Sequence, residues 1–178
     1  MQQTLIEFFG CTTLAGGIWN ISAYLAFIGI IIGVFSERYR NLLFTLGPAV
    51  LALYAYAFLH NPLFTALQVI IVVSGILQWL KIAKHTAITV IFSATIAAYI
   101  FLASINAITD VWGLIGSFGL LGIALGLAVL PWRPGFLVMA GGGALLAVYG
   151  FMVSAWVFFF LNIFFAVANI LTWRKQRG

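Results

Sequence analysis

The sequence predicts an all-helical integral membrane protein with seven transmembrane helices. Of its 178 residues, 65% are hydrophobic and only 6% are charged, and the mean hydropathy is +1.19. In soluble domains about a quarter of the residues are charged, so the eight Lys and Arg and three Asp and Glu here are too few for a water-facing surface. The apolar runs are also long, each near the roughly 20 residues that a helical span requires.

Charged residues, prolines and short polar clusters divide the apolar sequence into segments. Clear breaks lie at 36–41, 60–62, 81–86, 106–110 and 131–134. A sixth break is placed near Val153 and Ser154, because the run of about 40 residues that precedes Arg174 is long enough for two crossings. None of the segments alternates apolar and polar residues as barrel strands do. The expected spans are 17–35, 42–59, 63–80, 86–105, 111–130, 135–152 and 155–173.

The basic residues predict how the chain is oriented. With seven spans, all eight fall on one side of the membrane: Arg38, Arg40, Lys81, Lys84, Arg133, Arg174, Lys175 and Arg177. Basic loops stay in the cytoplasm, so we expect a multi-pass protein of the bacterial cytoplasmic membrane with its N-terminus outside and its C-terminus in the cytosol. These charges would meet anionic lipid headgroups rather than nucleic acid.

An internal repeat organises the chain. Residues 67–81, LQVIIVVSGILQWLK, return as residues 161–175, LNIFFAVANILTWRK, with six of fifteen positions identical. Trp19, Gly29 and Gly33 likewise recur 93 residues later, as Trp112, Gly122 and Gly126.

Each copy holds three helices, so a linker span is needed for both copies to run parallel. We therefore expect a 3+1+3 arrangement of two parallel three-helix bundles. The parts are an extracytoplasmic segment (1–16), a first bundle (17–81), a linker helix (86–105), a second bundle (111–173) and a cytoplasmic tail (174–178). Parallel repeats are a transporter architecture, with the substrate site near the midplane where the halves meet.

Residues 36–81 resemble the Pnu-type (PnuC-like) vitamin transporters, a family that shares the 3+1+3 arrangement with SWEET-type sugar facilitators. The resemblance rests on the charged turn after the first span, the tyrosine-rich end of the second, the turn NPLFTA before Gln68, and Gly75-x-x-x-Trp79. It implies facilitated diffusion of a small vitamin-like compound of the nicotinamide riboside or thiamine type. Phe44 stands where the family usually has Trp, and Gly141–Gly143 stand where it has a polar residue, so the substrate is open.

Charged groups are absent from the expected spans. Ion-coupled transporters and proton relays place ionisable groups within the membrane, so the sequence favours an uncoupled facilitator. His60 and His85 fall in loops on opposite sides and cannot share a metal. With no catalytic triad and no metal cluster in the sequence, we expect no enzyme activity, no metal and no cofactor.

Polar residues within the spans are candidate substrate-binding groups. Gln68 and Asn162 are equivalent in the two copies, and Asn169, seven residues after Asn162, shares its helix face. An amide in hydrocarbon must find a partner. Two interpretations are open: interhelical hydrogen bonds worth about 0.6–2 kcal/mol each, or a ligand-lined pathway. The resemblance favours the second, because matched positions in Pnu-type proteins line the substrate path.

Aromatic residues complete the candidate site. Tyr54, Tyr56 and Tyr149, near the outer ends of their spans, could stack on a flat, cationic ring or belong to an aromatic belt. Trp79 and Trp173 could gate the cytosolic mouth, and Gln78 is grouped with them. All six Trp lie at span ends or in loops, as in an aromatic belt. The expected partners are a small-molecule substrate and membrane lipid, and a homo-oligomer is compatible with the sequence. The alternatives are a SWEET-type sugar facilitator and a non-transporting membrane interaction or assembly protein.

Overall fold

The computed structural model describes residues 14–36, 38–129 and 132–175, and its regular secondary structure there is entirely α-helical. Each predicted span coincides with one helix, with ends that agree within three residues. In chain order the helices are α2 (Leu14–Phe35), α3 (Arg40–Ala57), α4 (Pro62–Trp79), α5 (Lys84–Ser104), α6 (Val111–Val129), α7 (Arg133–Met152) and α8 (Trp156–Lys175).

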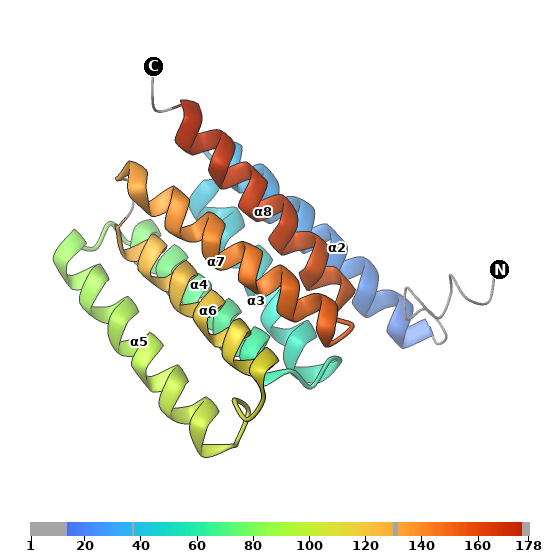
Figure 1. Ribbon diagram of the computed structural model, residues 1–178. Helices are drawn as coiled ribbons and strands as arrows, with labels where there is room; N and C mark the ends of the chain where they lie inside the picture. The colour runs from blue at the N-terminus through green and yellow to red at the C-terminus, as the bar shows by residue number, and fades with distance from the viewer. Residues whose placement is uncertain (1–13, 37, 130–131, 176–178) are drawn as a thin grey trace.

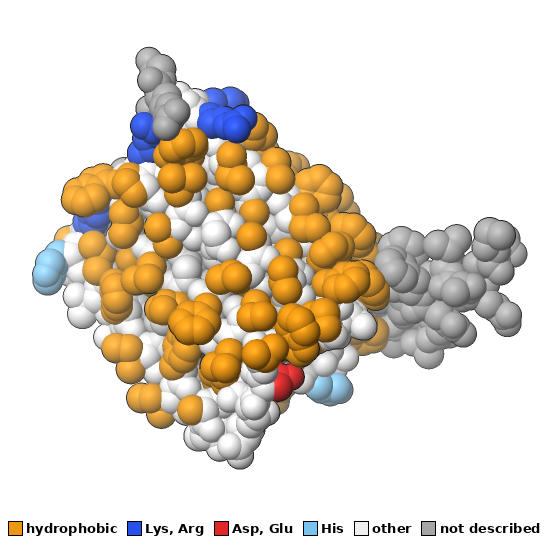
Figure 2. Space-filling model, viewed as in Figure 1, with side chains coloured by type: hydrophobic (Ala, Val, Ile, Leu, Met, Phe, Trp, Pro, Cys, Tyr) orange, Lys and Arg blue, Asp and Glu red, His pale blue; other side chains and the backbone are white. Residues whose placement is uncertain are grey.

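Six of these seven helices have the length and composition to cross a membrane. The exception is α3, whose apolar part, Asn41–Ala57, is shorter, and lies at the lower limit of the roughly 17–25 residues that a span needs. Hydrophobic side chains cover much of the visible surface (Figure 2). A chain with this surface and these helices is a multi-pass membrane protein, as its composition predicts.

The helices pack in two consecutive sets. Helix α3 packs between α2 and α4, and α7 packs between α6 and α8. The sets meet where α2 contacts α8 and where α4 contacts α6. Figure 1 shows α6, α7 and α8 as a layer in front of α4, α3 and α2, with α5 at one edge. Helix α5 contacts both α4 and α6, and the Tyr99 hydroxyl on α5 donates a hydrogen bond to the Ser117 carbonyl on α6.

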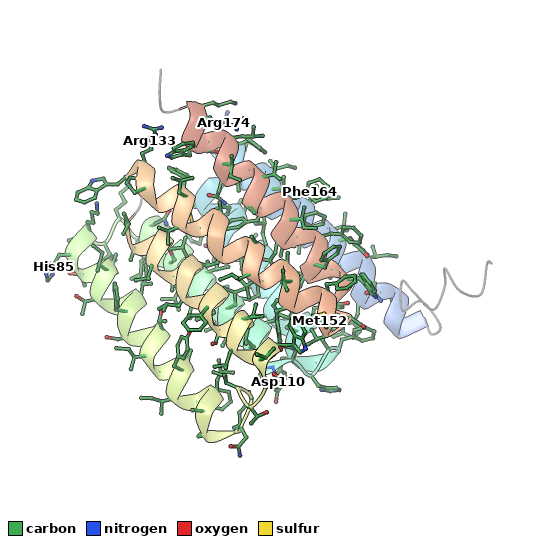
Figure 3. All side chains as sticks on the ribbon, in the orientation of Figure 1. His85, Asp110, Arg133, Met152, Phe164 and Arg174 are labelled. Carbon is green, nitrogen blue, oxygen red and sulfur yellow. The ribbon has the colours of Figure 1, made fainter. Side chains whose placement is uncertain are left out.

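Charge is segregated along the helix axes. Arg133 and Arg174 lie at one end of the bundle, and Asp110 and Met152 lie at the other (Figure 3). The other described basic side chains belong to connections or helix ends at this same end of the bundle: Arg38, Lys81, Lys84 and Lys175. We call this the basic end, and the end with Asp110 the opposite end.

Four helices are followed, within three residues, by a non-glycine residue with left-handed backbone geometry. These residues are His60 (φ 50°), Lys81 (φ 52°), Asn106 (φ 52°) and Ser154 (φ 56°). After Ser154, the Ala155 amide donates to the Gly150 carbonyl at 2.8 Å, which is the 6→1 hydrogen bond of a Schellman motif. A definite helix stop therefore exists at the sixth break, although no charged residue marks it in the sequence.

Glycines of the two sets make similar helix contacts. A Cβ atom at Gly47 on α3 would lie 3.1 Å from the Ala26 carbonyl oxygen on α2, and one at Gly142 on α7 would lie 2.7 Å from the Gly119 carbonyl oxygen on α6. The offsets are 119 − 26 = 93 and 142 − 47 = 95. The contacts of α2 with α3 thus resemble those of α6 with α7, although the offset of 95 is one to two residues larger than the offsets of the sequence repeat.

Candidate functional site

A small cavity of about 20 Å³ lies in the centre of the bundle. It contains both members of the equivalent amide pair, Gln68 and Asn162, whose residues are only 1% and 3% exposed. Its walls come from α2, α3, α4, α6 and α8: Ile30, Phe44, Leu67, Gln68, Ile71, Ile123, Leu127, Leu161, Asn162 and Phe165. The fold therefore brings residues 94 positions apart (162 − 68 = 94) to one place between the two helix sets.

The amides around this cavity differ in their hydrogen bonds. Asn162 Nδ2 donates to the Phe158 carbonyl at 2.7 Å, and Asn169 Nδ2 donates to the Phe165 carbonyl at 2.8 Å, both within α8. Within the described part of the chain, Gln68 Oε1 is buried and has no hydrogen-bond partner. A buried acceptor without a partner costs about 1–3 kcal/mol. Gln68 is thus the amide whose acceptor a bound solute would satisfy.

An aromatic layer adjoins the cavity on the side of the opposite end. It consists of Tyr54, Phe64, Tyr149 and Phe158. The central pair, Phe64 and Phe158, stacks with ring centroids 4.1 Å apart and ring planes 7° apart. Tyr149 lies 5.2 Å from Phe64, and Tyr54 lies 6.2 Å from Phe158, measured between ring centroids. The Phe pair has the same offset as the amide pair, 158 − 64 = 94, and precedes it by one helical turn.

Asparagine side chains hold the outer rings of the layer. The Tyr54 hydroxyl donates to Asn20 Oδ1 at 2.8 Å, which joins α3 to α2. Asn61 Nδ2 donates to the Tyr149 hydroxyl at 3.0 Å, which joins the connection before α4 to α7. Phe64 and Phe158 are themselves 0% exposed. The layer therefore closes the axis between the central cavity and the opposite end.

A larger cavity of about 290 Å³, here called the vestibule, lies toward the basic end. Phe44 and Leu127 line both the vestibule and the central cavity, and so stand between them. Polar lining is supplied by Lys84, Gln78 and Ser74. Gln78 Nε2 donates a hydrogen bond to the Ser74 hydroxyl at 3.3 Å. The remaining walls are apolar: Leu77, Ile82, Ala87, Ile88, Ile91, Ala128 and Phe136.

Other predicted site residues lie away from this axis. Tyr56 is 70% exposed and lines a groove of about 720 Å³ between α4 and α5. Trp79 is 61% exposed. Trp173 is half-buried. The Arg133 guanidinium lies 4.6 Å from the centroid of the Trp173 ring, and Arg133 Nε donates a hydrogen bond to the Trp173 carbonyl. Asn169 is buried but does not line the central cavity.

The structure adds residues that the sequence analysis did not select. Phe64 and Phe158 form the centre of the aromatic layer, and Phe44 separates the two cavities. A signal for the first two was available, because the 94-residue offset of the repeat pairs Phe64 with Phe158. Among the 17 phenylalanines of the chain, aromatic character alone does not distinguish them.

Within the described residues, no group of three or more His, Cys, Asp or Glu side chains could hold a metal ion. Comparisons with protein-family models, with curated proteins and with solved structures found no match to this chain.

Proposed function

We propose that the protein is a membrane transporter for facilitated diffusion of a small vitamin-like compound, of the nicotinamide riboside or thiamine type. In this proposal α2–α4 and α6–α8 are two parallel three-helix bundles, α5 links them, and all seven helices cross the membrane. The observation that carries it is that Gln68 and Asn162, equivalent in the two copies, line one central cavity. Repeat interfaces near the midplane are where such transporters bind substrate.

The order of features along the axis supports an alternating-access mechanism. From the basic end they are the vestibule, the central cavity and the aromatic layer. At about 290 Å³ the vestibule approaches the roughly 300–1,000 Å³ of small-molecule sites, whereas the central cavity has room for about one water molecule. A solute would reach Gln68 only when the halves move apart, and the aromatic layer would separate only in the alternate state.

The placement of charge supports uncoupled transport. In the described helices, Lys, Arg, Asp and Glu occur only in first or last turns, at Arg40, Lys84, Arg133, Arg174 and Lys175. Proton and ion relays normally use ionisable groups within the membrane. We further propose that the basic end faces the cytosol, by the positive-inside rule.

Uptake into proteoliposomes tests this function. Labelled nicotinamide riboside, thiamine, riboflavin and glucose are supplied to vesicles with the protein and to protein-free vesicles. We expect saturable, downhill uptake of an aromatic compound and none of glucose. Glucose uptake alone would support the sugar facilitator instead. Uptake of none of the four, by protein shown to be folded, would contradict this proposal and favour the membrane assembly alternative.

A further inference from the structure

We propose that Phe64 and Phe158 are the ligand-stacking pair of the pathway. A planar aromatic ring enters between their faces while Gln68 Oε1 accepts a hydrogen bond from it. This inference rests on the proposed transport function and deepens it, since it assigns the residues that hold the aromatic ring of the substrate and the acceptor for its N–H or O–H donor.

The geometry of the two rings suits such a sandwich. Phe64 and Phe158 already face each other in parallel, with planes 7° apart. A ring inserted between them needs two stacking distances of about 3.5–4.0 Å, so the 4.1 Å centroid separation would grow by about 3–4 Å. Phe64 is on α4 and Phe158 is on α8, in different halves, so separating the halves separates the rings.

The other two rings of the aromatic layer pack against Phe64 and Phe158. Tyr149 packs on Phe64 and Tyr54 packs on Phe158, and their hydroxyls are held by Asn61 and Asn20. Each phenylalanine thus contacts the ring of a tyrosine in a different helix. Because these ring orientations are already fixed, little side-chain conformational entropy is lost when a ligand stacks between the rings.

The free acceptor determines the polar part of the ligand. Gln68 follows Phe64 by one helical turn, and its buried Oε1 has no partner among the described residues. The nearby Asn162 Nδ2 is already bonded within α8. A ligand that offers a donor to Gln68 satisfies a buried group, whereas a ring with only acceptors leaves it unpaired. Amides, amines and hydroxyls on the ring are therefore favoured.

Ligand affinity in matched variants tests the pair. Nicotinamide riboside is titrated calorimetrically into the purified protein and into Phe64→Leu, Phe158→Leu and Phe164→Leu. Phe164 is the control, because it lies on the same helix as Phe158 but is 52% exposed. Ring stacking on an aromatic side chain is worth a factor of roughly ten or more in affinity. We expect Kd to rise by at least about tenfold in the first two variants, unchanged binding in the control, and recovery in Phe158→Tyr, which keeps a ring.

A matched pair of ligands serves as a second test without substitutions. Benzamide and cyclohexanecarboxamide carry the same amide and differ in whether the ring is flat and aromatic. We expect benzamide to compete with nicotinamide riboside and the saturated compound to compete at least about tenfold less well. Equal competition by the two compounds would overturn the inference, even if the Leu variants failed to fold.

Failure of the inference and failure of the function are distinguishable. If nicotinamide riboside is transported and both Leu variants bind it as tightly as the unsubstituted protein, the ring pair is wrong and the transport function stands. If binding depends on Phe64 and Phe158 but no flux occurs, the site stands and transport is wrong. Neither binding nor flux of any probe by folded protein would overturn both.

Discussion

Replacing Gly142 with alanine should weaken the contact between α6 and α7, whereas replacing Gly141 should not. A Cβ atom at position 142 would lie 2.7 Å from both the Gly119 carbonyl oxygen and the Ile123 amide nitrogen. Both are backbone atoms of α6, and cannot turn aside as a flexible side chain can. At position 141 no atom lies within 4 Å of the added carbon.

The size of the effect follows from comparing these neighbours. Both substitutions gain the same helix propensity, up to about 1 kcal/mol for Gly to Ala, so that contribution cancels in the difference between them. The remaining contribution is steric, because carbon and its neighbours normally approach to about 3.5–4.0 Å and the two helices must separate to restore that distance. Overpacking of this kind costs about 1–3 kcal/mol. Gly142→Ala should therefore be less stable than Gly141→Ala by about 1–3 kcal/mol.

Thermal unfolding of the two variants in the same detergent measures this difference. For a chain of this length, each kcal/mol corresponds to about 2–4 °C in Tm, so we expect Gly142→Ala to melt about 2–12 °C below Gly141→Ala. Equal melting temperatures would refute the close approach of α6 and α7, and with it the correspondence of this contact to that of α2 with α3. A loss of stability in Gly141→Ala alone would show that the wrong face of α7 has been placed against α6.

The other predictions concern binding, coupling and orientation. Asn162→Leu should weaken binding of nicotinamide riboside by about 1–3 kcal/mol because it removes a polar side chain that lines the central cavity. Asn169→Leu should mainly lower the melting temperature of the protein without ligand, because Asn169 does not line that cavity. Normal affinity in Asn162→Leu would remove Asn162 from the site. Initial uptake should persist when an ionophore collapses proton or sodium gradients, because Lys, Arg, His, Asp and Glu occur in the described helices only in their end turns. Immediate loss of uptake would indicate coupling. With Cys11 replaced by Ser, a cysteine at Val153 should react with an impermeant thiol reagent on intact cells and one at Ala83 should not; the reverse pattern would invert the orientation.

The sequence alone determined the seven helices and the pairing of their repeats. Helix positions were predictable because a bilayer sets the length of each apolar run, and charged or polar breaks divide the runs. That Gln68 and Asn162 line one cavity was predictable because they occupy equivalent positions of the sequence repeat. The same offset would have paired Phe64 with Phe158, had it been applied to apolar residues as well.

Only the tertiary structure decided which face of each helix points inward. Tyr54 and Tyr56 are two residues apart, yet the first is buried against Phe158 and the second is 70% exposed. Among three consecutive glycines, a Cβ atom added at Gly142 would meet the α6 backbone, whereas one added at Gly141 would meet no atom within 4 Å. In a water-soluble protein, an amphipathic sequence pattern indicates which face of a helix is buried. In a membrane protein, the lipid-facing side chains are as apolar as the core. Apart from the intramembrane amides, the sequence therefore carries little signal for the inward face, and helix packing selects it.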